Sequence, residues 1–158
     1  MSWVSLGIEL GLKCHCNKLH MLCNSREDTL MKQFRAAVEA RDVEAMKACL
    51  AEDVRFVSPV AFKPYDGKAI TSAILSNVIQ VFENFRYVRE IEDDPHSALV
   101  FEAEVDGKTL TGCDFIVVNE EGLISEFMVM VRPLSGAQAL AEAMGARFDR
   151  IVAEAAGQ

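Results

Sequence analysis

Asp114 is the residue with the clearest chemical potential, because it lies inside an apolar stretch, Gly112-Cys113-Asp114-Phe115-Ile116-Val117-Val118. In a strand, period-two alternation places Ile116 and Val118 on the same face as Asp114. Burial among such neighbours raises the pKa of a carboxyl group and favours a neutral acid that donates a hydrogen bond. The alternatives are an acid at a solvated strand end, or a structural acid that caps a loop or pairs with an arginine. The sequence leaves these interpretations open.

Cysteine and histidine residues, which are potential metal ligands, gather within residues 1–25. They are Cys14, His15, Cys16, His20 and Cys23. Thiolates and imidazoles favour zinc, but adjacent ligands are geometrically awkward and no second knuckle follows, so a loose extension is favoured. We predict no metal site and no cofactor. Cys113 adjoins Asp114, but alternation turns their side chains to opposite faces, which favours a packed thiol over a nucleophile.

The composition bounds the class of protein. The chain has 158 residues, of which 51% are hydrophobic, and a formal net charge of -8. The length suits one domain with its own core. The negative charge argues against nucleic acid and anionic membrane partners, because both require a cationic surface. No apolar run reaches the roughly 18 residues of a membrane span, and the odd cysteine count suggests no disulfide framework. We therefore expect a cytoplasmic protein.

The elements that must position Asp114 follow from hydrophobic periodicity. Residues 1–25 are predicted to be a poorly ordered extension, and residues 26–158 one domain. Helical spacing predicts helices from about residue 27, after an Asp42 cap, over 68–82 and over about 136–155. Alternation predicts strands at about 54–58, 85–92, 98–105, 109–118 and 123–132, with glycine-containing hairpins between several of them. The order predicts an α+β fold with a mostly antiparallel sheet curled around the helices.

The two faces of the predicted sheet differ in what must cover them. Leu99, Phe101, Ala103 and Val105 alternate onto the face that meets the helices. The last strand is apolar on both faces, so the outer face also needs a cover. A partner subunit is the favoured cover, and the C-terminal helix is the alternative. The predicted homodimer interface consists of Phe115, Val117, Met128 and Met130.

Three stretches of the chain resemble the nuclear-transport-factor-2-like superfamily, which includes SnoaL-like polyketide cyclases and ketosteroid isomerase. They are Phe34 through Pro59, Lys63-Pro64-Tyr65-Asp66-Gly67, and Asp114 through Val131. The resemblance implies a cone-shaped, cystatin-like α+β barrel that encloses an apolar pocket. It says little about the reaction, because this fold carries isomerases, hydrolases, dehydratases, cyclases and non-catalytic members.

The resemblance carries over to the site only in part. Ser58, before Pro59, stands where ketosteroid isomerase has its general base, and Phe34 stands where that enzyme has a hydrogen-bonding tyrosine. Asp114 matches the aspartate that this enzyme keeps protonated in an apolar site. Limonene epoxide hydrolase requires an arginine that Gly112-Cys113-Asp114 lacks. The resemblance therefore implies neither of these two reactions.

The predicted site is an apolar pocket with few polar groups. Its catalytic candidates are Asp114, Ser58 and Tyr87. Its predicted ligand-binding wall comprises Phe34, Phe56, Leu99, Phe101, Phe127 and Val129. A single acid in such a pocket can transfer a proton, worth about 10²–10⁴-fold in rate, or anchor one polar group of a ligand. We therefore predict a protein with a small-molecule pocket. Its predicted function is an acid–base reaction of the isomerase, cyclase or hydrolase type on a small lipophilic substrate. The alternatives are a non-catalytic binding protein and a dimeric structural module.

Overall fold

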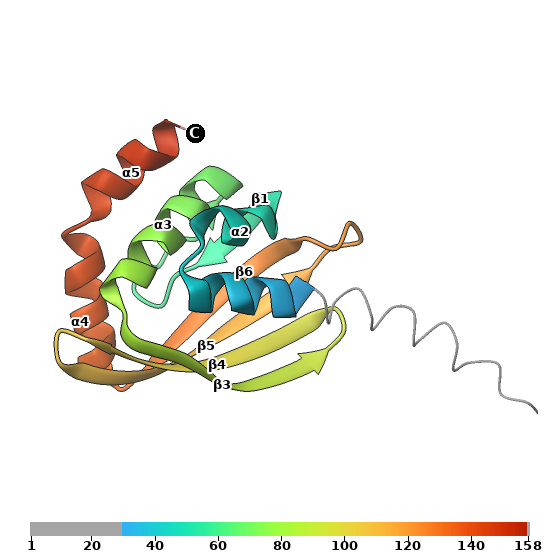
Figure 1. Cartoon of the computed structure of the whole chain (residues 1–158). Helices are drawn as coiled ribbons and strands as arrows, with labels where there is room; N and C mark the ends of the chain where they lie inside the picture. The colour runs from blue at the N-terminus through green and yellow to red at the C-terminus, as the bar shows by residue number, and fades with distance from the viewer. Residues whose placement is uncertain (1–29, 158) are drawn as a thin grey trace, which may run out of the picture.

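The computed structural model describes residues 30–157, in which helices cover one face of a six-stranded sheet (Figure 1). Residues 30–40 are helical, and the later elements follow in order. They are α2 (Val43–Ala48), β1 (Leu50–Val57), β2 (Tyr65–Asp66), α3 (Lys68–Val81), β3 (Glu83–Asp93), β4 (His96–Val105), β5 (Lys108–Val118), β6 (Ile124–Arg132), α4 (Leu134–Gly145) and α5 (Phe148–Ala156). The predicted extension and its cysteine and histidine residues lie outside the described residues.

The sheet has the strand order β2-β1-β6-β5-β4-β3 and is curved but not closed. Every neighbouring pair is antiparallel except β1 and β6, which are parallel. Asp106 and Gly107 both have positive φ in the turn between β4 and β5, as the sequence predicted for a hairpin. The alternation predicted for β4 is confirmed, since Leu99, Phe101, Ala103 and Val105 are at most 2% exposed.

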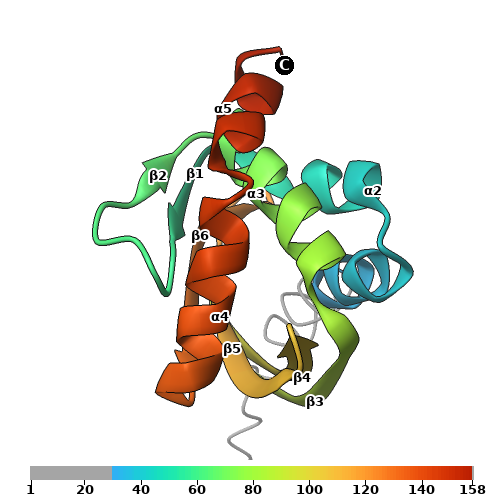
Figure 2. The same ribbon diagram turned by 90° about the vertical axis from the view of Figure 1, so that its left-hand side faces the viewer.

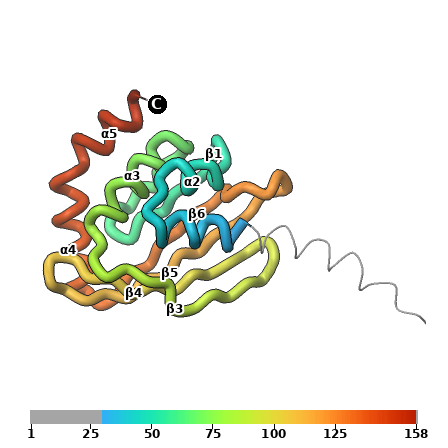
Figure 3. The backbone as a smooth tube through the Cα atoms, viewed as in Figure 1, coloured from blue at the N-terminus to red at the C-terminus, as the bar shows by residue number. Residues whose placement is uncertain are grey.

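Capping interactions hold the helical layer together. Asp42 caps α2, as predicted, because its Oδ1 accepts a hydrogen bond from the Ala45 amide at 3.0 Å. The neighbouring Arg41 donates to the carbonyl oxygens of Ile79 and Phe82 at 2.7 and 2.9 Å. These carbonyls lie at the C-terminal end of α3, so Arg41, in the turn before α2, also caps α3. Figure 3 follows this path from the first described helix through α3.

The C-terminal part of the chain differs from the prediction. The single helix expected over about 136–155 is wrong, because α4 ends at Gly145 and α5 starts at Phe148. Figure 2 shows α4 beside the sheet and α5 continuing above it, next to α3. A Cβ atom on Gly136 would lie 2.8 Å from the Leu110 side chain, so glycine permits the close approach of α4 to β5. The described residues contain no helix long and apolar enough to span a membrane.

Candidate functional site

A cavity of about 290 Å³ lies between the helical layer, the inner face of the sheet and the C-terminal helices. Its helical lining includes Phe34, Met46, Ile74, Leu75, Val78 and Ile79. Its sheet lining includes Phe56, Tyr87, Phe101, Asp114, Phe127 and Val129. Leu140, Met144, Phe148 and Ile151 line it from α4 and α5. The wall formed by residues 30–157 is therefore overwhelmingly apolar, with Asp114 as its one acidic residue.

Asp114 lies on β5 with its side chain directed inward, and it is 6% exposed. The Tyr87 hydroxyl donates a hydrogen bond to Asp114 Oδ2 at 3.0 Å, although Tyr87 lies on β3, two strands away. The other carboxyl oxygen, Oδ1, receives no hydrogen bond from residues 30–157. The buried acid therefore has one oxygen fixed by the protein and one available to a molecule in the cavity.

Burial controls the protonation of this pair. It raises the pKa of Asp114 from 3.8 to about 7, even though the Tyr87 hydrogen bond acts in the opposite direction. The pKa of Tyr87 is also well above its usual value, because of burial first and the neighbouring Asp114 charge second. Near neutral pH, Tyr87 is thus a hydrogen-bond donor, and Asp114 is divided between its acid and its carboxylate. The interpretation of Asp114 as an acid at a solvated strand end is wrong.

A glycine makes this arrangement possible. Gly112 pairs with Phe101 across β4 and β5, and a Cβ atom on Gly112 would lie 2.1 Å from Phe101 Cζ. The Phe101 ring therefore occupies the space above Gly112. It also packs edge-on to Tyr87, with ring centroids 6.4 Å apart. Because residue 112 has no side chain, the Phe101 ring can lie over it and contact the Tyr87 ring.

Arg35 supports Tyr87 from the first described helix and was not identified from the sequence. Its guanidinium carbon lies 5.7 Å from the centre of the Tyr87 ring, within the range of a cation–π contact. Two ion pairs orient the same group, to Glu39 at 3.0 Å and to Glu90 at 3.2 Å. Arg35 does not line the cavity, so its positive charge acts from behind the tyrosine rather than on a ligand.

Two aromatic clusters form the remaining wall. Phe127 makes edge-on contacts with Phe34 and Phe56, with centroids 5.5 and 5.7 Å apart. Phe101 contacts Phe82 and Phe85 at 5.5 and 5.3 Å. Edge-on and offset rings pack favourably because the positive ring edge meets the negative ring face. These contacts pack the aromatic rings of the wall against one another.

Ser58 also lines the cavity, but its hydroxyl serves the local loop. The Ser58 Oγ accepts a hydrogen bond from the Val60 amide at 3.2 Å. All of the predicted site residues line the cavity except Leu99. Leu99 is completely buried in the packed core. The alternation of apolar residues predicted the face of the sheet on which Leu99 lies, but not whether Leu99 borders the cavity or packs in the core.

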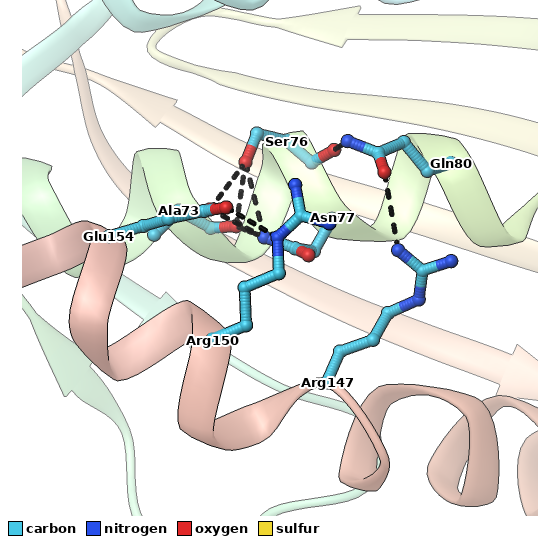
Figure 4. Close-up of polar contacts among 7 residues, drawn as sticks. All are labelled: Ala73, Ser76, Asn77, Gln80, Arg147, Arg150 and Glu154. Atoms are coloured by element: carbon cyan, nitrogen blue, oxygen red, sulfur yellow. Dashed lines mark hydrogen bonds and ion pairs between the residues drawn. The ribbon is translucent and has the colours of Figure 1, made fainter.

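A polar clamp holds α5 against α3 beside the cavity (Figure 4). Glu154 Oε2 accepts hydrogen bonds from Asn77 Nδ2 at 2.8 Å and from the Ser76 hydroxyl at 3.4 Å. Glu154 Oε1 forms an ion pair with Arg150 at 2.6 Å. Asn77 is completely buried, so the clamp reaches into the protein interior. The sequence predicted only that this region is helical.

The outer face of the sheet is not covered by α4 or α5, which contribute to the cavity instead. The alternative that the C-terminal helix covers this face is therefore wrong. Phe115 and Met130 are 38% and 54% exposed there, and Val117 and Met128 are half-buried. Cys113 is a free thiol on this face, away from Asp114. Within residues 30–157, no group of three or more histidine, cysteine, aspartate or glutamate residues is placed to hold a metal ion.

Comparison with known proteins places this geometry in a family. The model of the SnoaL-like domain matches residues 31–127. A steroid delta-isomerase from Pseudomonas aeruginosa is 37% identical, with a TM-score of 0.77, over 82% of this chain and 96% of the isomerase chain. An uncharacterized protein with a cystatin-like fold from Silicibacter pomeroyi is 36% identical, with a TM-score of 0.75, over 79% and 91% of the two chains.

More distant structures share the fold alone. An NTF2-like protein of unknown function from Cytophaga hutchinsonii is 20% identical, with a TM-score of 0.55, over 68% of this chain and 90% of its own. No curated protein matches the sequence. The family model spans more than half of the chain, and the fold is that of the related structures. The chain belongs to the SnoaL-like domain family of the nuclear-transport-factor-2-like superfamily.

Proposed function

We propose that the cavity binds a small lipophilic organic molecule and that protonated Asp114 donates a hydrogen bond to an oxygen atom of that molecule. The observation that carries this proposal is the buried carboxyl group, held by Tyr87 through Oδ2 and without a partner at Oδ1 among residues 30–157. A hydrogen bond from a neutral acid polarises a carbonyl or an epoxide oxygen. The site therefore suits an acid–base reaction of the isomerase, cyclase or hydrolase type.

The acid–base reaction would depend on Asp114, because it is the one acidic residue that lines the cavity within the described part of the chain. Asp114 has a pKa of about 7, so both of its protonation states are populated near neutral pH. One such group can donate a proton in one step and accept a proton in another. The 37% identical relative named as a steroid delta-isomerase supports a reaction of the isomerase type. A reaction that uses Asp114 alone would differ from acid–base mechanisms in which two carboxylates act together.

Ligand binding without catalysis is the second candidate function. It is favoured by Ser58, because this hydroxyl accepts a hydrogen bond within its loop and a serine is a weak base without an activating partner. In this case Asp114 and Tyr87 would only orient the ligand, and the apolar wall would provide most of the affinity. A purely structural module is less well supported, because it predicts a filled interior rather than a cavity of about 290 Å³.

The two candidates are separated by Asp114→Asn, assayed with a panel of lipophilic ketones, epoxides and polyketide-like molecules. Asparagine keeps the shape and a hydrogen-bond donor but cannot transfer a proton. An enzyme should lose turnover by about 10²–10⁴-fold while its calorimetric Kd changes much less. Binding without turnover in the wild-type protein would favour the second candidate, and the absence of both would refute the proposal. Cys113→Ser is the matched control, since this neighbour faces the other side of the sheet.

We also propose that the outer sheet face forms a homodimer interface. Ala98, Phe115 and Met128 lie in register across three strands, and their apolar row adjoins another that contains Met130. Such a row suits an identical partner, because a two-fold axis brings the same apolar surface from each copy together. Phe115→Lys should convert a dimer into a monomer in analytical ultracentrifugation. Wild-type protein that sediments as a monomer at all concentrations would contradict this proposal.

A further inference from the structure

The size and charge of the cavity define a narrower class of ligand than the fold does. We infer that the natural ligand is an uncharged molecule of one or two rings, with one oxygen acceptor that binds Asp114, and that a four-ring skeleton is too large. This inference rests on the proposed function, because it concerns the same carboxyl group. Beyond the proposed function, the inference specifies the size of the ligand, its charge and which end of the ligand enters the cavity first.

The volume limits the size of the ligand. An apolar protein cavity of about 150 Å³ accommodates benzene, which has six carbon atoms. By simple scaling, the cavity of about 290 Å³ here takes roughly 12 non-hydrogen atoms. This number corresponds to a two-ring ketone or a similar compact molecule. A larger molecule would have to displace α5 or α4, whose Ile151 and Leu140 are 1% and 3% exposed, or leave part of its skeleton outside the cavity, beyond the exposed Val60 and Phe148.

The charges limit the chemistry of the ligand. Among residues 30–157, those that line the cavity include no lysine, arginine or histidine, and Asp114 is the one carboxyl group there. A carboxylate or phosphate in this cavity would lose its hydration without meeting an opposite charge, which is strongly unfavourable. Arg35 cannot compensate, because it is paired with Glu39 and Glu90 behind the Tyr87 ring. An uncharged ligand avoids this penalty.

The positions of the polar groups fix the orientation of the ligand. Asp114 and Tyr87 are both buried in the sheet wall, whereas Ser58, Val60 and Phe148 lie where the lining reaches half-buried and exposed residues. The oxygen of the ligand must therefore enter first and bind at the closed end. The hydrocarbon part then contacts the phenylalanine rings, and its far edge faces the end of α4. A polar group at that far edge would not be needed for binding.

The inference is tested by isothermal titration calorimetry with cyclohexanone, 2-decalone and a four-ring steroid ketone. We expect 2-decalone to bind at least about tenfold more tightly than cyclohexanone, because it buries more apolar carbon atoms. We expect the steroid ketone to bind at least about tenfold more weakly than 2-decalone, because overpacking disrupts the wall. If the steroid binds as tightly as 2-decalone, the size assignment is wrong and the proposed function stands. If no ketone binds at any size, both are wrong.

Two further measurements sharpen the result. Met144→Ala removes a cavity-lining side chain from α4 and should reduce the disadvantage of the steroid relative to 2-decalone, whereas Gln138→Ala, on an exposed position of the same helix, should not. The affinity of 2-decalone should fall above about pH 7 as Asp114 loses its proton. A two-ring amine that binds more tightly than 2-decalone, with affinity rising through the same pH range, would overturn the assignment of an uncharged ligand.

Discussion

The sheet side of the cavity and its C-terminal helical side are built in different ways. On the sheet side, β3 to β6 pair through antiparallel ladders, and Leu99, Phe101, Ala103 and Val105 of β4 are at most 2% exposed. On the helical side, α5 packs chiefly against α3, and a polar clamp centred on Glu154 connects the two helices. The sheet side holds the buried pair Asp114 and Tyr87, on β5 and β3, which both pair with β4.

This difference separates two tasks. Groups that act on a ligand need fixed positions, because small displacements weaken hydrogen bonds and proton transfer. Groups that admit a ligand need to move, and regions held by few contacts open at a lower free energy than the global unfolding. We therefore expect the sheet wall to control chemistry and orientation, and the α4–α5 wall to control size and access. Each of the following predictions tests this division.

The largest expected effect on the free energy of unfolding comes from a leucine-to-alanine substitution, made once on each side of the cavity. Leu99→Ala empties a closely packed position in the sheet and should lower the free energy of unfolding by about 2–5 kcal/mol. Leu140→Ala changes the same side chain on α4, but this leucine already borders the cavity and has fewer contacts to lose. Its cost should therefore lie at the lower end of that range. Urea denaturation measures both, and equal losses would show that the two walls are equally well packed.

The next effect is the pH dependence contributed by Asp114. Between pH 3.8 and about 7, the folded protein keeps a proton that the unfolded chain has released. The unfolded state then binds fewer protons, so the free energy of unfolding falls by about 1.4 kcal/mol per pH unit as pH rises through this window. Above about pH 7 the contribution becomes constant. Asp114→Asn should lack this slope when unfolding is measured by urea titration from about pH 4 to pH 8.

The sign of this dependence distinguishes burial from ion pairing. A carboxylate that is stabilised by a positive charge would instead make the protein more stable as pH rises. The difference between wild type and Asp114→Asn cancels the titration of the other carboxylates. A difference that does not change with pH would show that Asp114 is charged throughout this range, and would remove the acid on which the proposed function depends.

The sequence predicted the sheet side of this comparison well. The alternation of Leu99, Phe101, Ala103 and Val105 is a local property, and one buried face determines the register of a strand. The capping residue Asp42 and the Asp106-Gly107 turn are local signals of the same kind. The burial of Asp114 stayed open, because it depends on Tyr87 and on the rings that surround both residues. Tyr87 lies on a strand that does not neighbour β5, so no short-range pattern connects the two residues.

The helical side was predicted less well, for a different physical reason. The apolar positions of α4 and α5 follow one continuous helical period, so they predicted one helix. Gly145 is the local signal for the break, since glycine weakens a helix interior. The clamp could not be predicted, because Asn77, Ser76 and Glu154 come from helices that meet only in the folded chain. Leu99 illustrates a related limit, since alternation distinguishes faces but does not show which residues border a cavity.

A smaller effect on the free energy of unfolding is expected from a glycine-to-alanine substitution on each side of the cavity. Gly112→Ala places a methyl group against the Phe101 ring and should lower the free energy of unfolding by about 1–3 kcal/mol. Gly145→Ala adds the same group where no atom beyond the neighbouring helix backbone lies within 4 Å, and it should be neutral or stabilising by up to about 1 kcal/mol. Thermal and urea unfolding measure both variants. Equal tolerance of the two changes would show that the Phe101 ring can move away and that the sheet wall is less rigid than its contacts indicate.

The smallest effect on global stability, with a larger effect on local motion, is expected at the clamp. Glu154→Ala removes the acceptor of Asn77 and the partner of Arg150, which has a 57% exposed side chain. An exposed ion pair contributes little, and Asn77 keeps its bond to the Ala73 carbonyl, so the global loss should be about 1 kcal/mol. Hydrogen exchange of the α5 amides should accelerate several-fold more than exchange in β4 and β5.

Glu142→Ala is the matched control, because this glutamate is exposed on α4 and takes no part in the clamp. It should leave exchange in α5 unchanged. If Glu154→Ala accelerates exchange equally in α5 and in the central strands, then α5 opens only when the whole domain unfolds. In that case the helical wall is as firmly held as the sheet wall, and a ligand must reach Asp114 without the movement of α5.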